Sequence, residues 1–214
     1  MVVVHVRGEE NGLGGDAQRP LDRSPSQSCW TFSGASMNGD RYSQWIRVSH
    51  AVGGVDQYRA FMAVAIQGLA RLDCQLIAAA EQFLQLTEQQ RATIPVSVEL
   101  SERLTLSYLW VLGAYEIVRT LDQRTREAST GTPPPVAERI TATKHLFERV
   151  RIPLAKFEAS RRNANDSPIA YPAISPVHGV AWLVADNTFV PRRQLSDALL
   201  ALLSDLRAER EGKG

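Results

Sequence analysis

Apolar residues recur along most of this chain with the spacing of α-helices. The longest run begins at Asp56 and continues to about Gln90, and its apolar positions alternate steps of three and four residues. That alternation places them along one side of a helix, as in a coiled-coil seam. The members of this seam are Met62, Ala65, Leu69, Leu72, Leu76, Ala79, Phe83 and Leu86. The pattern predicts a first long helix that packs through this side.

A second helix is predicted from Ser101 to Glu127, and its apolar residues are not confined to one side. One row consists of Leu104, Tyr108, Val111, Tyr115 and Val118. Trp110 and Ile117 lie outside that row. A helix that is apolar on more than one side usually lies at the centre of a domain. The linker of residues 91–96 is short, and Ser97 or Ser101 can cap the helix that follows, so we expect the two helices to be antiparallel neighbours.

The rest of the chain predicts two further helices and a β-hairpin. A third helix begins near Pro135, and Pro153 should kink or restart it. After the proline-rich residues 161–178, apolar residues on both sides of Asp186 predict a two-stranded hairpin with a tight turn. A last helix follows from about Arg193. The expected fold class is mainly α, an antiparallel bundle of about four helices with one short β-hairpin before the C-terminal helix.

The first residues lack this periodicity. They are rich in glycine, proline and serine, which predicts a poorly ordered N-terminal arm over residues 1–54 and a single helical domain over residues 55–210. The aromatic cluster around Tyr42 and Trp45 could pack onto the domain as a short arm. The sequence leaves open whether translation starts at Met1 or at Met37.

Net charge, cysteine content and the length of apolar stretches indicate which kinds of partner and cofactor to expect. The net charge of +1 favours neither a nucleic-acid partner nor a membrane. The two cysteines, Cys29 and Cys74, match neither a disulfide framework nor a metal spacing. That usage favours a cytoplasmic protein without a metal or a cofactor. No stretch reaches the roughly 18 apolar residues of a membrane span, so we expect no membrane partner.

The predicted third helix and the residues after it carry an excess of positive charge. The basic residues are Arg139, Lys144, Arg149, Arg151, Lys156, Arg161 and Arg162, against only Glu138, Glu148 and Glu158. Such a strip could bind the phosphates of RNA. More often, charges on a helix form a solvated face with ion pairs between successive turns. RNA is therefore an alternative partner.

Arg139 and His145 are separated by five residues. An arginine and a histidine at this spacing on a late helix resemble the catalytic pair of HEPN ribonucleases. The resemblance implies metal-independent RNA cleavage, with His145 as general acid or base and Arg139 stabilising charge on the phosphate. In that family a polar residue commonly follows the arginine, whereas Ile140 follows it here. On an ideal helix the two side chains point about 120° apart, so a shared site would need distortion or a homodimer.

The proline-rich segment and the hairpin gather polar and aromatic residues. A binding surface is expected there, because loops held by a rigid scaffold often carry function. Its candidate members are Arg162, Asp166, Tyr171, His178 and Trp182. Alternatively, Trp182 belongs to the core and the polar residues satisfy loop backbone groups. A small-molecule pocket between the hairpin and the third helix is a further interpretation.

The sequence contains no nucleophile elbow, no glycine-rich phosphate loop after a strand and no paired-histidine metal spacing. It therefore favours a non-enzymatic, intracellular interaction or regulatory module with a protein partner. The HEPN-like ribonuclease and the small-molecule-binding helical domain are the alternatives.

Overall fold

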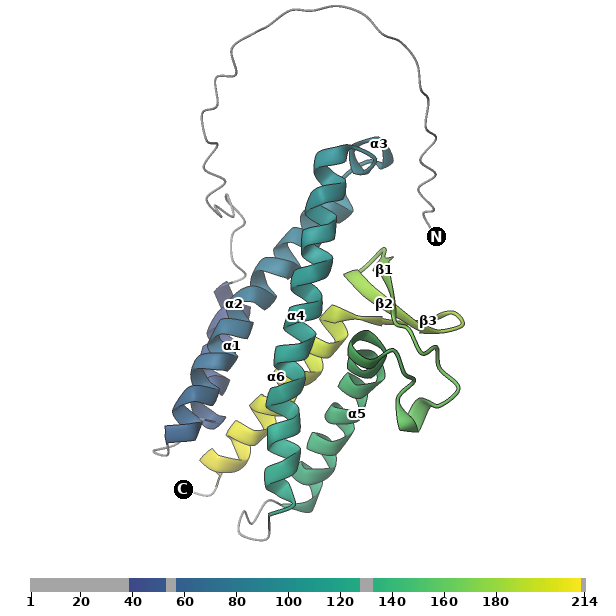
Figure 1. Ribbon diagram of the computed structural model, residues 1–214. Coiled ribbons are helices and arrows are strands. Elements are labelled where there is room, and N and C mark those ends of the chain that lie inside the picture. The colour runs from purple at the N-terminus through teal and green to yellow at the C-terminus, as the bar shows by residue number, and fades with distance from the viewer. Residues whose placement is uncertain (1–38, 53–56, 128–132, 213–214) are drawn as a thin grey trace, which may run out of the picture. The chain divides into compact units, whose positions relative to one another are not determined.

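The computed structural model describes residues 39–52, 57–127 and 133–212. Over these ranges the chain is mostly helical, with a small antiparallel sheet before the last helix, which confirms the predicted fold class (Figure 1). The α-helices are α1 (Gly39–Val52), α2 (Gln57–Gln85), α3 (Glu88–Arg91), α4 (Ile94–Thr125), α5 (Pro134–Lys156) and α6 (Arg192–Glu211). A short 3-10 helix covers Arg161–Asn163.

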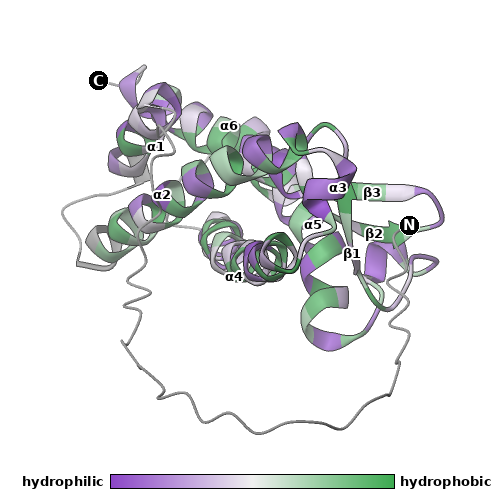
Figure 2. Ribbon diagram, turned by 90° about the horizontal axis from the view of Figure 1, so that it is seen from above, coloured by the Kyte–Doolittle hydropathy of each residue, from purple (hydrophilic) through white to green (hydrophobic). Residues whose placement is uncertain are grey.

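The two longest helices, α2 and α4, are antiparallel neighbours joined by the short helix α3. Thr87 and Gln90 cap α3 reciprocally, each side chain bonding the backbone N–H of the other residue. Pro95 lies in the first turn of α4, where its missing N–H leaves no hydrogen bond unmade. Seen along the bundle, α4 lies between α2 and α5 (Figure 2). Its buried residues, which include Trp110, Ala114 and Val118, therefore point to more than one side.

Helix α1 corrects the predicted domain boundary. Residues 39–52, expected within a poorly ordered arm, form a helix that packs against α2 and α6. Trp45 is fully buried, and Val48 is 4% exposed in the same core cluster. The arm prediction is therefore wrong for this stretch, because its apolar side chains complete the core of the bundle. The remaining residues of the predicted arm, Met1 and Met37 among them, lie outside the described ranges.

The buried face of α2 differs from the predicted seam in its first half. Ile66 and Ala70 are buried there, whereas Ala65 is exposed and Leu72 is only half-buried. The helix contacts α1 as well as α4, so its buried face has to be broader than a heptad seam. In the second half, Phe83 and its seam neighbours Leu76 and Ala79 are buried as predicted.

One stretch among the described residues, Phe61–Gln85, is long and apolar enough to cross a membrane by length and composition alone. This corrects the expectation that no stretch reaches that length. Of its most apolar window, 44% is buried within the fold, and core helices of soluble proteins meet the same criterion. The finding is weak evidence for a membrane span.

A third strand enlarges the predicted hairpin. The sheet has the order β1 (Tyr171–Ser175), β2 (Gly179–Ala185), β3 (Thr188–Pro191), all antiparallel. The predicted hairpin corresponds to β2 and β3, and Asn187 in its turn has a positive φ of 56°. Strand β1 comes from the segment expected to be irregular. Its Pro172 is tolerated because β1 is an edge strand, where a missing N–H need not be paired.

The sheet approaches α2 closely at Gly179. This residue has a φ of +71°, and a Cβ placed on it would lie 2.5 Å from the Cβ of Ala80. Glycine alone adopts this conformation without strain and leaves room for the helix. The start of β2 is therefore held against α2, which brings the β1–β2 turn beside the C-terminal turns of that helix.

Candidate functional site

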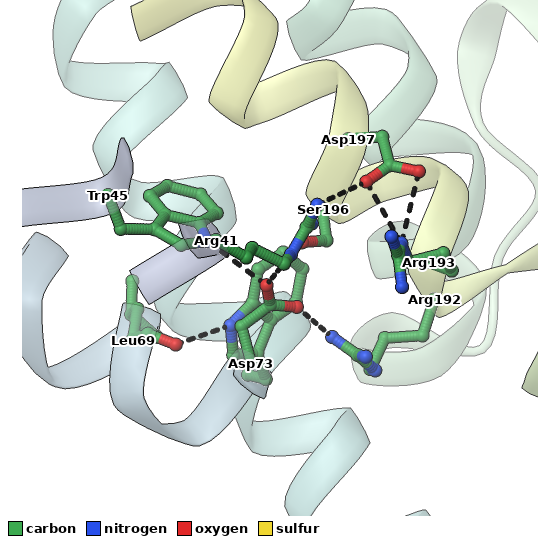
Figure 3. A network of polar contacts seen from close by, with 9 residues as sticks. Arg41, Trp45, Leu69, Asp73, Arg192, Arg193, Ser196 and Asp197 are labelled. Atoms are coloured by element: carbon green, nitrogen blue, oxygen red, sulfur yellow. Dashed lines mark hydrogen bonds and ion pairs between the residues drawn. The ribbon is translucent and has the colours of Figure 1, made fainter. Parts of the chain in front are cut away.

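The carboxylate of Asp73 joins α1, α2 and α6. Asp73 lies on α2 and is fully buried. Its Oδ2 accepts hydrogen bonds from Arg41 Nε at 2.8 Å and from Trp45 Nε1 at 3.0 Å, both on α1 (Figure 3). Its Oδ1 accepts from Nη1 of Arg192, the first residue of α6, at 2.6 Å. One side chain thus connects segments that are far apart in the sequence.

The network continues from this core to the surface. Arg41 Nη2 donates to Ser196 Oγ at 2.5 Å, and Arg41 Nη1 lies 2.8 Å from Asp197 Oδ1. Arg193 Nε also donates to the Asp197 carboxylate, at 3.0 and 3.2 Å. The side chain of Asp197 is 52% exposed, whereas that of Arg41 is 9% exposed. The outer carboxylate therefore balances charge at the rim of a buried cluster.

Electrostatics keep Asp73 ionised. Burial alone would raise the pKa of this carboxyl, but the charges of Arg192 and Arg41 outweigh burial and hold the pKa below its ordinary value. Replacing a whole buried ion pair by apolar residues is often neutral for stability. Removing only one partner is destabilising, because the other charge is then buried and unpaired. The neighbouring thiol behaves differently: burial raises the pKa of Cys74 to about 11, which leaves the thiol unreactive.

A small hollow lies beside this network, between α2, α4, the β1–β2 turn and the start of α6. Its volume is about 10 Å³, room for roughly one water molecule. Its walls are mostly apolar and include Leu76, Phe83 and Ile174. Its polar side chains are Arg103, Ser107, His178 and Arg192. No aspartate or glutamate of the described residues lines it, but its two arginines are each paired with a carboxylate beyond the lining, Arg192 with Asp73 and Arg103 with Glu99.

A second polar cluster joins α4 to α5. Asp122 of α4 accepts hydrogen bonds from Thr141 at 3.1 Å and from Arg126, and Lys144 Nζ lies 2.9 Å from it. Burial would raise the pKa of Asp122, but the hydrogen bonds from Lys144 and Arg126 lower it. Lys144 also lies 3.6 Å from Glu148, so the cluster is paired within itself. These contacts fix the two helices relative to each other.

The structure does not bring Arg139 and His145 together. Arg139 pairs with Asp205 of α6 at 2.7 Å. Burial is the largest cause that lowers the pKa of His145, and the positive charge of Arg162 lowers it further. The charge of Glu148 acts in the opposite direction. Both residues lie on the uninterrupted helix α5, so they point to different sides. A catalytic pair across a homodimer remains a prediction.

Much of the basic strip is engaged within the fold. Arg139 and Lys144 form the ion pairs already described, and Arg149 binds both carboxylate oxygens of Asp166 at 2.7 and 3.1 Å. The guanidinium of Arg151 lies 5.0 Å from the ring centre of Tyr115. These contacts favour a structural role for the strip, and RNA binding remains a prediction.

The candidate binding residues do not form a single surface. Trp182 is 2% exposed and belongs to the core, as the alternative interpretation of this residue expects. It is therefore not available to a partner. Asp166 is held by an arginine of α5. Arg162 and Tyr171 are exposed, and His178 is exposed in the β1–β2 turn where it borders the hollow.

Sequence reasoning missed the Asp73 network. A signal was present in α2, where Asp73 stands between Leu72 and Cys74 inside an apolar pattern. A second signal is Arg192, because a positive charge at the start of a helix opposes the helix dipole and requires compensation. Neither signal names the partner residue, which comes from a distant segment.

The described residues contain no group of three or more histidine, cysteine, aspartate or glutamate side chains placed to hold a metal ion. Comparison of the chain with known protein families, curated proteins and solved structures found no match. Function must therefore be inferred from the residues of this chain alone.

Proposed function

We propose that this protein is a non-enzymatic, cytoplasmic interaction module that binds a partner protein through one face of its sheet. The observation that supports the proposal is a row of apolar side chains across the three strands, Tyr171, Leu183 and Phe189, here called the sheet row. In the register of the sheet, Tyr171 lies opposite Leu183, and Leu183 lies opposite Phe189. Tyr171 is 52% exposed and Phe189 is 50% exposed.

The sheet row lies on the face opposite the core. Successive residues of a strand point to opposite faces, and the neighbours Trp182 and Val190 are 2% and 3% exposed in the core. With strands about 4.8 Å apart, the row spans roughly 10 Å. Aromatic side chains are enriched at protein interfaces, since they bury a large area on binding. An accessible row with two aromatic residues therefore fits a contact surface for another protein.

The edges of the sheet are less suited to binding than this face. Pro172 lies in β1 and Pro191 in β3, so both edge strands contain a residue that cannot donate a backbone hydrogen bond. Addition of an extended peptide strand is disfavoured at such edges. The proposed partner therefore contacts the sheet row with an apolar surface of its own, such as one side of a helix.

The buried ionisable groups support the non-enzymatic part of the proposal. Asp73 is paired with Arg41 and Arg192, and Asp122 is paired with Lys144. Groups paired in this way hold helices together and have no free charge for acid–base chemistry. The free, buried thiol of Cys74 agrees with a reducing compartment.

Site-specific crosslinking in cells tests the proposal. A photo-reactive phenylalanine analogue would replace Phe189 in one variant and Phe61, an aromatic residue of α2 that is 70% exposed, in a matched variant. We expect a protein partner to be captured at position 189 and not at position 61.

The captured partner then allows an affinity measurement. The double substitution Tyr171→Ser and Phe189→Ser should weaken its binding to the purified protein by about tenfold or more, because interface aromatics commonly contribute most of the binding energy. Phe61→Ser should leave the affinity unchanged, and all variants should melt near the wild-type temperature. Equal effects at both sites would contradict the proposal.

A further inference from the structure

Ser107 is a buried hydroxyl that the fold leaves without a partner. The residue is fully buried on α4, and no described group accepts from or donates to its Oγ. Other hydroxyls of the same helix behave differently. Ser101 and Thr105 each donate to the backbone carbonyl four residues earlier, at 3.1 and 3.0 Å. Because buried polar groups are nearly always hydrogen-bonded, the Ser107 hydroxyl on the wall of the hollow indicates a missing partner.

Arg192 offers further donors at the same place. Its side chain is 4% exposed, and its only hydrogen-bond acceptor among the described residues is Asp73, through Nη1. A guanidinium carries five N–H groups, so most of them are left for another acceptor. The group is held firmly, since it also lies 5.3 Å from the ring centre of Trp110. Arg192 lines the hollow together with Ser107.

The surroundings add further positive groups, although both arginines of the hollow already have a carboxylate partner: Arg192 pairs with Asp73, and Arg103 lies 2.8 Å from Glu99. Arg192 begins the 20-residue helix α6, whose N-terminal amides form the positive end of the helix dipole. The preceding Pro191 provides no side-chain cap for them. Arg103 and His178 line the same hollow. Among the lining side chains, hydrogen-bond donors therefore outnumber acceptors, which suits an anion.

We propose that the hollow binds the carboxylate of a small organic acid. The carboxylate accepts from Arg192 and from the Ser107 hydroxyl, and the short apolar body of the acid rests against Leu76, Phe83 and Ile174. Ligand sites are typically apolar with a few converging polar groups, as here. This site is separate from the sheet row and does not depend on the protein partner proposed above.

The lining of the hollow favours a carboxylate over a phosphate. The hollow is partly open and its volume of about 10 Å³ admits one oxygen-sized group, so one carboxylate oxygen enters it and the rest of the acid lies at its open side. The apolar walls also reward an apolar body, which inorganic phosphate lacks. The positive groups distinguish an acid from a neutral molecule of the same shape.

Calorimetric titration of the purified full-length protein tests the proposal. The probes are isobutyrate and benzoate, with isobutyramide and benzamide as neutral counterparts of the same shape and inorganic phosphate as an anion without an apolar body. We expect saturable binding of at least one carboxylate and none of either amide. Binding of the amides at equal strength, binding of phosphate as tight as that of the carboxylates, or binding of no carboxylate would overturn the proposal.

Two substitutions locate the site, each with a matched control. Ser107→Ala and Arg103→Gln should each weaken carboxylate binding by about tenfold, as expected for loss of a hydrogen bond or charge next to an anion. Ser101→Ala, on the exposed side of the same helix, and Arg193→Gln, next to Arg192 but outside the hollow, should leave the affinity unchanged. An unchanged affinity in Ser107→Ala would show that the hydroxyl is merely unsatisfied, and the assignment would fail.

Discussion

At the scale of single residues, the core of this protein depends on one ionised carboxylate. Asp73 receives hydrogen bonds from two arginines and a tryptophan, and the residue is fully buried. A neutral side chain of the same shape could keep some of these hydrogen bonds but not the charge. Arg41 and Arg192 would then share a region of low polarity without their common counter-ion.

Asp73→Asn should therefore lower the free energy of unfolding by about 3–5 kcal/mol, the usual cost of leaving buried charges unpaired. Asp197→Asn is the matched control, because it removes a carboxylate that also pairs with Arg41 but is 52% exposed. Its cost should be at most about 1 kcal/mol. Chemical denaturation measures both values, and similar losses for the two variants would show that burial of Asp73 is not the deciding factor.

The same carboxylate makes stability depend on acidity. The pKa of Asp73 is lower in the folded protein than its ordinary value of 3.8 in the unfolded chain, so the folded state holds the proton less tightly. Its contribution is therefore complete above pH 3.8 and is lost as the pH falls below that value towards the folded pKa. Unfolding free energies measured from pH 6 down to about pH 2 should fall more steeply for the wild type than for Asp73→Asn. Parallel curves would show that other carboxyls dominate the acid response.

At the scale of elements, local periodicity predicts the four long helices and misses what depends on distant partners. The runs that became α2, α4, α5 and α6 carry enough apolar residues at helical spacing to be recognised. Helix α1 is shorter and bears buried polar groups such as Arg41, whose partner Asp73 lies 32 residues away. Such pairing leaves no trace in a local pattern.

The sheet and the hollow also depend on contacts that cannot be recognised in the local sequence pattern. The prolines of residues 161–178 suggested an irregular loop, yet β1 forms because an edge strand tolerates Pro172. Of the candidate site residues, His178 reaches the hollow, whereas Trp182 faces the core. Ser107 and Arg192 could not be assigned from the sequence, since the hollow exists only where α4, α6 and the β1–β2 turn meet.

The arrangement of α5 also yields a functional prediction. Arg139 pairs with α6, and His145 lies near other charges, so no shared catalytic site forms within one chain. We expect the purified protein to leave RNA intact in the presence of EDTA, with His145→Ala indistinguishable from the wild type. The measurement is cleavage of several labelled RNAs by preparations free of contaminating nuclease. EDTA-resistant cleavage that disappears in His145→Ala would establish the ribonuclease alternative instead.

At the scale of the whole molecule, the first described helix, α1, completes the hydrophobic core of the bundle. Helix α1 contacts α2 and α6, and its Trp45 is fully buried in the cluster that all the long helices share. The contact also places Arg41 next to Asp73, which in turn orients Arg192 at the hollow. The core and the proposed anion site therefore both depend on α1.

The most direct test of this account compares two shortened chains, one of residues 39–214 and one of residues 57–214. Removal of α1 uncovers the apolar surface that Trp45 fills and leaves Asp73 without Arg41. Loss of the tryptophan contact alone should cost about 3–5 kcal/mol. Thermal and chemical denaturation should therefore show a cooperative transition for residues 39–214, and a transition at much lower temperature, or none, for residues 57–214. Equal stability of the two chains would contradict the account, because α1 would then be an appendage and not part of the core.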